Sequence, residues 1–201
     1  DFGAGGYINL SKDLDREDDD SNPFMISTTP GVIYRNELII GSRVAESADG
    51  APGHIRAYNV LTGKRDWIFH TIPHPGEIGY DTWPDKDAYK KLGGANNWAG
   101  MSVDVDRGIV NVPTGSISGD FYGGFREGQN LFANSLIAIE ASTGNYLWHF
   151  QTVHHDLWDR DLPANPNLVT LNIEGKEIYA VAQISKQGFI FLFDRTSGEP
   201  I

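Results

Sequence analysis

The segment from His154 to Asp161 (HHDLWDRD) holds two histidines, three carboxylates and a tryptophan within eight residues. It directly follows a strand-like stretch, Tyr146 to Val153. Carboxylates and imidazoles transfer protons and bind metals, and such groups commonly act from loops at the ends of strands. Taken alone, the segment is also compatible with a solvated polar turn that anchors one tryptophan. The rest of the chain favours the chemical interpretation.

The composition narrows the function classes. The chain has 201 residues, with 27 acidic and 16 basic side chains and a formal net charge of −11. An acidic protein repels phosphate backbones, so we expect no nucleic-acid partner. The absence of cysteine excludes disulfides, thiol catalysis and cysteine-ligated zinc within this chain. The acidic run Asp13–Asp20 predicts a solvated loop; a calcium loop is a weaker alternative, because glycine and a closing glutamate are missing at EF-hand spacing.

Short apolar runs between glycine-rich turns predict an all-β fold. One short helix is expected over Asp85–Leu92, and no segment carries a sustained helical period. Two long excursions, Thr71–Asn97 and Ser116–Leu131, have a length that is commonly functional. The expected strands are Val32–Tyr34, Leu38–Ile40, His54–Asn59, Trp67–His70, Gly108–Val112, Ser135–Glu140, Tyr146–Val153, Glu177–Ile184 and Phe189–Asp194.

An internal repeat organises these strands. AYNVLTGKRDW spans Ala57–Trp67, AIEASTGNYLW spans Ala138–Trp148, and FLFDRTSGEPI spans Phe191–Ile201, where the chain ends. Each copy places a strand before an acidic or amide residue, a Thr-Gly or Ser-Gly turn, and the start of the next strand. Repeated units of this kind indicate the blades of a propeller, at roughly 40–50 residues per blade.

The turn chemistry of the repeat predicts three features. A glycine in each copy supplies the positive φ that a tight turn needs, and the preceding Asn59, Glu140 or Asp194 can cap the turn's amides. The tryptophan that ends the first two copies is expected to pack between neighbouring sheets. The glycines are Gly63, Gly144 and Gly198, and the tryptophans are Trp67 and Trp148.

Further motifs accompany the repeat: IIGSRVAES, NNWAGMSVD, TVHHDLWDRDLPANP and SKQGFIFLFDRTSG. Together they resemble the quinoprotein dehydrogenases, eight-bladed propellers that bind pyrroloquinoline quinone (PQQ), and the glucose dehydrogenase branch is the most similar. The resemblance covers the chain from about Met25 onward. It implies that a sugar or alcohol hydroxyl is oxidised by hydride transfer to PQQ. It also implies a metal ion (Ca²⁺, another divalent ion or a lanthanide), a quinone or cytochrome as electron acceptor, and a periplasmic location.

The resemblance also implies site residues. Asp159 matches the catalytic aspartate, which takes the proton from the substrate hydroxyl and lies beside or ligates the metal. Glu46 matches an acidic metal ligand. Trp98 matches the indole beneath the PQQ ring, and Lys186 matches the cation beside the reactive quinone carbonyl. A base near a cation and a fixed positive charge beside a developing oxyanion are chemically sensible in those roles.

Other positions are less definite under the same resemblance. Thr28 and Thr29 lie near a family hydroxyl that bonds a PQQ carboxylate, and the sequence does not choose between them. His154 and His155 are expected either to support the residues that contact the cofactor or metal, or to be structural. Ser116 stands where some relatives carry an asparagine metal ligand, and serine is the poorer ligand. Asp161 matches an aspartate that accompanies lanthanide use in the alcohol branch of the family. The glucose branch carries the same aspartate, so Asp161 does not identify the metal.

Length is the largest departure from the family. Eight blades need at least about 320 residues, so we expect residues 1–201 to form one partial propeller of about three blades, the last without its closing strand. The remaining blades of a longer parent chain would then be its partners, and the isolated fragment would be inactive. Two alternatives stay open: a propeller scaffold or binding module without redox chemistry, and, more weakly, a carbohydrate-binding or glycosidase domain that uses the acids as a pair.

Overall fold

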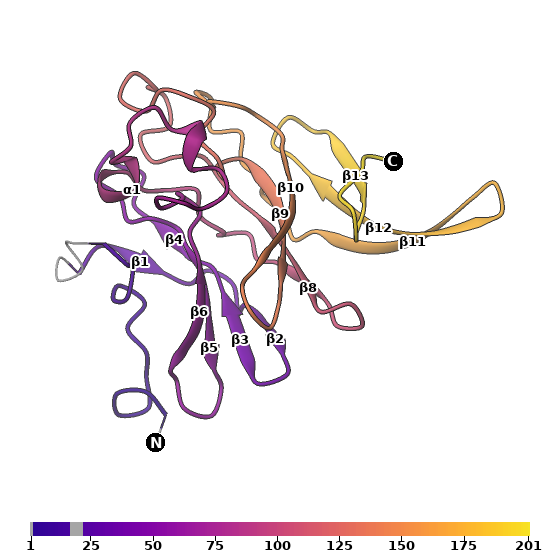
Figure 1. Ribbon diagram of the computed structural model, residues 1–201, viewed down its shortest axis with the longest axis horizontal. Coiled ribbons are helices and arrows are strands. Elements are labelled where there is room, and N and C mark those ends of the chain that lie inside the picture. The colour runs from indigo at the N-terminus through magenta and orange to yellow at the C-terminus, as the bar shows by residue number, and fades with distance from the viewer. Residues whose placement is uncertain (1, 17–21) are drawn as a thin grey trace.

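The computed structural model describes residues 2–16 and 22–201 and confirms the all-β class (Figure 1). In these residues, helical structure is limited to α1 (Ala88–Lys91) and a short 3-10 turn, Tyr80–Thr82. Residues 17–20 of the acidic run lie outside the described residues. The strands are β1 (Met25–Ile26), β2 (Val32–Tyr34), β3 (Glu37–Ile40), β4 (Arg43–Val44), β5 (Ile55–Asn59), β6 (Arg65–Phe69), β7 (Ser102–Asp104), β8 (Ile109–Pro113), β9 (Ser135–Glu140), β10 (Tyr146–Gln151), β11 (Asn167–Ile173), β12 (Lys176–Ile184) and β13 (Ile190–Asp194).

Three antiparallel meanders form the body of the described structure. Their strand orders are β2-β3-β5-β6, β7-β8-β9-β10 and β11-β12-β13, and β1 pairs with β4 in a small separate sheet. The first strands of successive meanders lie side by side, with β7 next to both β2 and β11. This arrangement is that of adjacent propeller blades, two with four strands and a third with three.

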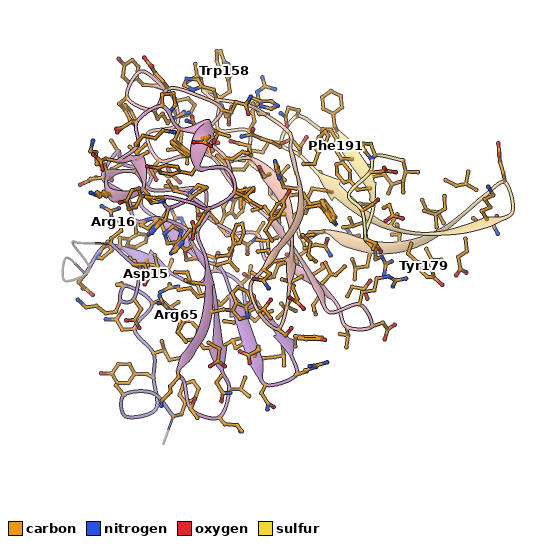
Figure 2. All side chains as sticks on the ribbon, viewed as in Figure 1. Asp15, Arg16, Arg65, Trp158, Tyr179 and Phe191 are labelled. Carbon is orange, nitrogen blue, oxygen red and sulfur yellow. The ribbon has the colours of Figure 1, made fainter. Side chains whose placement is uncertain are left out.

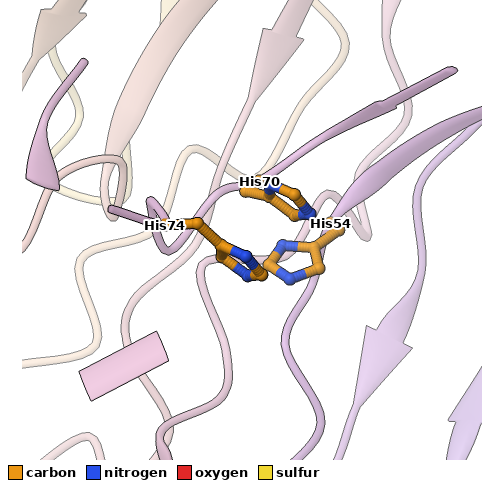
Figure 3. A group of neighbouring side chains, drawn as sticks. All are labelled: His54, His70 and His74. Atoms are coloured by element: carbon orange, nitrogen blue, oxygen red, sulfur yellow. The ribbon is translucent and has the colours of Figure 1, made fainter. Parts of the chain in front are cut away.

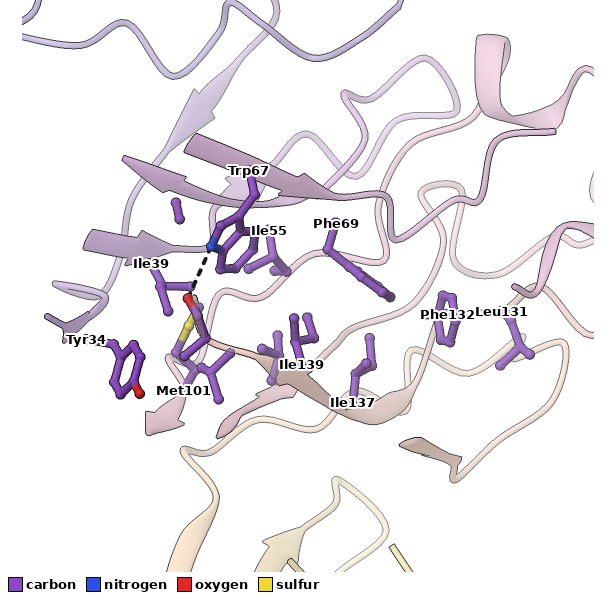
Figure 4. Packing of buried hydrophobic residues seen from close by; sticks show 14 residues of the cluster. Tyr34, Ile39, Ile55, Trp67, Phe69, Met101, Leu131, Phe132, Ile137 and Ile139 are labelled. Carbon is purple, nitrogen blue, oxygen red and sulfur yellow. Dashed lines mark hydrogen bonds between the residues drawn. The ribbon is translucent and has the colours of Figure 1, made fainter. Parts of the chain in front are cut away.

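The same tryptophan contact, repeated in two copies of the motif, couples each meander to the next. The indole of Trp67 lies on Gly144, and its Nε1 donates a hydrogen bond of 3.1 Å to the carbonyl of Ala141 (Figure 4). Trp148 lies in the same way on Gly198 and donates to the carbonyl of Arg195 at 3.3 Å. The prediction that both indoles pack between neighbouring sheets is therefore confirmed.

The turn glycines have the predicted backbone, with φ of 72° at Gly63, 77° at Gly144 and 76° at Gly198. Asn59 and Asp194 accept hydrogen bonds from turn amides, as expected. The longer side chain of Glu140 bonds instead to the side chains of the turn. The prediction that Glu140 caps the turn's amides was therefore wrong. Its longer side chain places the carboxylate beyond the amides that a shorter acid would meet.

Alternation along the third strand of the second meander separates two hydrophobic clusters. In β9, Ile137 and Ile139 face the first meander, whereas Leu136 and Ala138 face the third. All four side chains are fully buried. The excursion 71–97 has its own small hydrophobic core around Trp83. The indole Nε1 of Trp83 donates a hydrogen bond of 2.6 Å to the carbonyl of Leu131. The excursions are therefore packed parts of the fold.

Candidate active site

The antiparallel connectivity brings five loops to one end of the meanders. In each meander the second strand ends, and the first strand begins, at this end of the sheet. The segments that follow β3, β8 and β12, and those that precede β7 and β11, therefore meet there. The repeat turns lie at the opposite end, because they connect the third strand to the fourth. Chemistry-bearing residues that are distant in the sequence are thus brought together by topology alone.

A cavity of about 270 Å³ lies where these loops meet. Four predicted site residues line it: Glu46, Trp98, Asp159 and Lys186. The structure therefore brings together residues that are as far apart in the sequence as Glu46 and Lys186. The remaining lining residues are Arg43, Val44, Ala45, Asn96, Ser116, Ser118, Asp120 and Asp161.

Asp156 anchors the HHDLWDRD loop and does not line the cavity. Its buried carboxylate accepts hydrogen bonds from the amides of Trp158 and Arg160 and from the hydroxyl of Ser116, the last at 2.7 Å. Asn134 adds a fourth bond of 3.1 Å. The first carboxylate of the motif therefore has a structural role and leaves the other two for the cavity.

Trp158 is not the anchor of this loop. Its side chain is 71% exposed and lies at the outer margin of the molecule (Figure 2). The loop is held by polar bonds to Asp156 rather than by burial of an indole. The alternative of a polar turn that anchors one tryptophan is therefore wrong about the tryptophan.

Asp161 organises the cation and the indole of the cavity. Its carboxylate accepts hydrogen bonds from the Ser116 amide at 2.7 Å and from Trp98 Nε1 at 2.8 Å. Lys186 Nζ lies 3.3 Å from the same carboxylate and 5.8 Å from the centre of the Trp98 ring. Asp161 thus sets the position of the two groups that the family resemblance assigns to the cofactor.

Lys186 also forms an ion pair with Asp159, in which Nζ donates a hydrogen bond of 2.8 Å to Oδ2. Asp159 has a φ of 53°, a left-handed conformation that is costly outside glycine and is often found at functional sites. Burial raises the pKa of Asp159, and the negative charge of Asp161 raises it further. The hydrogen bond from Lys186 acts in the opposite direction and lowers the pKa of Asp159. Burial alone would lower the pKa of Lys186, but the two acids raise it. The pair is a carboxylate suited to accept a proton beside a lasting positive charge.

Asp120 is a cavity residue that the sequence did not predict. Burial, followed by the charges of Asp159, Asp161 and Glu46, raises its pKa to about 6. The signal available in the sequence was its position in the second long excursion, without any motif of its own. The cavity therefore holds four neighbouring carboxylates, which oppose each other's ionisation unless a cation is present.

Thr28, Thr29 and His155 do not line the cavity, whereas Ser116 does. Thr28 is exposed, and its hydroxyl donates a hydrogen bond of 2.8 Å to the backbone carbonyl of Trp98. Thr29 is the next residue in the chain and does not line the cavity either. Their role as cofactor ligands stays a prediction. His155 Nδ1 lies 2.9 Å from the carbonyl of Gly128, a structural contact. Ser116 lines the cavity, but its hydroxyl is bonded to Asp156.

The donor chemistry of the cavity fits a hard cation and a planar anionic cofactor. Carboxylate oxygens from Glu46, Asp120 and Asp159 are the ligands that Ca²⁺ prefers. The half-buried indole of Trp98 offers a flat apolar face, and Arg43 and Lys186 offer positive charge within the same cavity. The residues present are thus compatible with a metal and a PQQ-like group.

Comparison with known proteins assigns the family. All 201 residues match the model for the β-propeller domain of glucose/ethanol/alcohol dehydrogenases of the PQQ type. The chain therefore belongs to the PQQ-dependent dehydrogenase family. It is 36% identical to quinoprotein glucose dehydrogenase A of Acinetobacter calcoaceticus over 206 residues, and 37% identical to a quinate/shikimate dehydrogenase (quinone) of Acinetobacter baylyi over 205 residues.

A solved structure agrees with this assignment. The quinohemoprotein alcohol dehydrogenase ADHIIG from Pseudomonas putida superposes with a TM-score of 0.75 and 32% identity, covering 84% of this chain and 26% of that one. The two Acinetobacter relatives are matched over 100% of this chain and 25% of their own length. The chain thus spans about a quarter of the length of the curated relatives it matches. Within its described residues, no helix has the length and apolar character to cross a bilayer.

Proposed function

We propose that this chain contributes the catalytic cavity of an enzyme that oxidises a sugar or alcohol hydroxyl by hydride transfer to PQQ, with a metal ion bound by the cavity carboxylates. The observation that carries the proposal is the convergence of Glu46, Trp98, Asp159 and Lys186 on one cavity. Family membership and the relatives named for glucose, quinate and alcohol oxidation support the same class of reaction. Bound PQQ would supply the hydride-accepting quinone.

Asp159 is the proposed general base. Its carboxylate lines the cavity, and burial raises its pKa above the ordinary value of an aspartate, which makes it a better proton acceptor. Removing the hydroxyl proton makes loss of hydride from the adjacent carbon easier. Oδ2 accepts the hydrogen bond from Lys186, and we propose that Oδ1 takes the substrate proton.

Lys186 supplies the proposed fixed positive charge. A cation in a low-dielectric cavity stabilises negative charge that develops during the reaction. Asp159 and Asp161 keep Lys186 protonated and limit the movement of its ammonium group. Trp98, tied to Asp161 through Nε1, provides the proposed ring-stacking surface.

Glu46, with Asp159, is the proposed core of the metal site, and the neighbouring Asp120 extends it. Mutual repulsion of these carboxylates disappears when a divalent or trivalent cation is bound, so the site favours occupation. We propose Ca²⁺ as the ion. We also propose a quinone or cytochrome as electron acceptor, the remaining blades of a parent protein as partners, and a periplasmic location; these proposals rest on the family resemblance.

Reconstitution of the full-length protein tests this function. The metal-depleted, cofactor-free protein is titrated with PQQ in the presence of Ca²⁺, and sugar and alcohol oxidation is followed with an artificial electron acceptor. We expect stoichiometric PQQ binding and turnover. Glu46→Gln should raise the Ca²⁺ concentration required, whereas Glu174→Gln, at the exposed β11–β12 turn, should not. Absence of PQQ binding would favour the non-catalytic propeller module.

A further inference from the structure

Three histidines meet at the edge of the first meander, outside the catalytic cavity (Figure 3). His54 precedes β5 and His70 follows β6, and the pairing of Ile55 with Phe69 makes these two histidines neighbours across the sheet. His74 lies in the excursion 71–97. One ring nitrogen from each histidine lies within 4.8 Å of those of the other two, a grouping of donors that stands out among residues 2–16 and 22–201.

We propose that His54, His70 and His74 bind a divalent transition-metal ion of the zinc type, which fastens the excursion 71–97 to the first meander. This site goes beyond the proposed dehydrogenase function and uses none of the residues of its cavity.

His70 is held in the orientation of a metal ligand. Its Nδ1 lies 2.8 Å from Glu77 Oε1, and an ionised carboxylate requires the proton on that nitrogen. Nε2 lies 3.3 Å from Asp15 Oδ2, and a metal ion would take the place of the proton between these two atoms. A carboxylate behind a ligating histidine is the usual outer partner in zinc sites. Two ligands of one tetrahedral zinc, each at about 2.0–2.1 Å, are also about 3.3 Å apart.

His54 contributes a buried nitrogen without a partner. The residue is 1% exposed, and its Nε2 has no hydrogen-bond partner among the described residues. Its Nδ1 accepts a bond of 3.1 Å from the Thr71 amide, so the metal-free ring carries its proton on Nε2. A metal on Nε2 requires that proton to move to Nδ1, so the bond from the Thr71 amide is lost and the ring has to turn toward Thr71 Oγ1, 3.5 Å away, as the new acceptor. The metal bond then replaces a buried donor without an acceptor, at the cost of the bond from the amide.

His74 completes the group. Its ring is stacked on that of His70, with centroids 3.8 Å apart and an interplanar angle of 3°. Its Nε2 has no partner among the described residues, and its backbone amide donates 2.7 Å to Glu77 Oε2. Glu77 therefore orients two of the three histidines at once. Ligands within 4.8 Å need to close by about 1.5 Å or less to reach tetrahedral zinc spacing.

The charged groups around the three histidines act in both directions. Arg56 and Arg16 add positive potential at His54, which opposes a cation. The carboxylates of Asp15 and Glu77 act in the other direction. Three imidazoles with one adjacent carboxylate select zinc and its neighbours over Ca²⁺, which prefers oxygen ligands.

Cobalt substitution in the full-length protein tests the site directly. The metal-depleted protein is first given excess Ca²⁺, which occupies the carboxylate cavity, and is then titrated with Co²⁺ and, in competition, with Zn²⁺. We expect one equivalent of Co²⁺ with the visible absorption of a low-coordinate, nitrogen-ligated ion, and its displacement by Zn²⁺. Thermal unfolding should shift upward with Zn²⁺ and return on chelation.

Matched variants locate the bound ion. His74→Gln and His70→Gln should each weaken Co²⁺ binding by at least about 100-fold, and Glu77→Gln by about 10–100-fold. His154→Gln, at an exposed histidine of the HHDLWDRD loop, should leave Co²⁺ binding unchanged. Absence of the Co²⁺ absorption in the wild-type protein would overturn the proposal. Equal Co²⁺ affinity in His74→Gln and His154→Gln would overturn it as well, because the ion would then lie elsewhere.

Discussion

Replacement of Gly144 by alanine tests how the blades are held together. Gly144 has a φ of 77°, and a Cβ at this position would lie 2.7 Å from Cε3 and 2.8 Å from Cδ2 of Trp67. The left-handed backbone costs an alanine about 1–2 kcal/mol. The indole must also move, although it is buried and bonded to the Ala141 carbonyl, and overpacking of this kind costs about 1–3 kcal/mol. Together, Gly144→Ala should lower the free energy of unfolding by about 2–5 kcal/mol.

Gly175→Ala is the matched control. Gly175 has nearly the same φ, 79°, but a Cβ there would meet nothing within 4 Å. Only the backbone cost of about 1–2 kcal/mol should appear. The difference between the two variants therefore isolates the contact with the indole. Denaturant unfolding of the full-length protein, followed by circular dichroism, gives both values.

A double-mutant cycle completes this test. In a Trp67→Ala background the obstacle to a Cβ at Gly144 is gone, so Gly144→Ala should cost only the backbone part. The expected coupling between the two positions is about 1–3 kcal/mol. Strict additivity, or equal destabilisation by Gly144→Ala and Gly175→Ala, would refute the reasoning that the turn glycine exists to receive the indole.

Three further predictions concern the cavity of the full-length protein. Lys186→Ala should slow turnover by about 10²–10³-fold while the fold is retained, as measured by steady-state kinetics and circular dichroism. Trp98→Ala should weaken PQQ binding in fluorescence titrations, because the ring-stacking surface is lost. In the metal-free protein, the pKa of Asp120 is raised from 3.8 to about 6 in the folded state, so protonation of Asp120 favours folding. This contribution to stability is fully present below pH 3.8 and is lost as the pH rises through about 6. Asp120→Asn should abolish that loss in thermal melts across this range, and an unchanged pH dependence would contradict it.

Much of the strand pattern could be predicted from the sequence because most strands carry strong apolar runs. Val32–Tyr34 and Ser135–Glu140 match β2 and β9 at both ends, and the helix expected over Asp85–Leu92 contains the shorter α1. Four strands were missed: β1, β4, β7 and β11. β1 and β4 are two residues each and exist only through their mutual pairing, whereas β11 is largely exposed and is stabilised by seven paired positions along β12.

The site divides in a similar way. Motif resemblance identified Glu46, Trp98, Asp159 and Lys186, which the fold gathers around one cavity. Asp120 was not identified, because its environment is created by loops from three other parts of the chain. The cluster of His54, His70 and His74 was also invisible in the sequence, since it depends on the register of β5 with β6. Local patterns predict elements, but contacts between loops require the fold.

The most direct test of the account is the turnover of Asp159→Asn in the full-length protein, reconstituted with PQQ and Ca²⁺. The amide keeps the shape of the side chain and an oxygen for the metal, but it cannot accept the substrate proton. We predict near-normal PQQ binding with turnover lowered by about 10²–10⁴-fold. Asp106→Asn, an exposed acid in the turn between β7 and β8, should be unaffected. Near wild-type turnover in Asp159→Asn would contradict the assignment of Asp159 as the base.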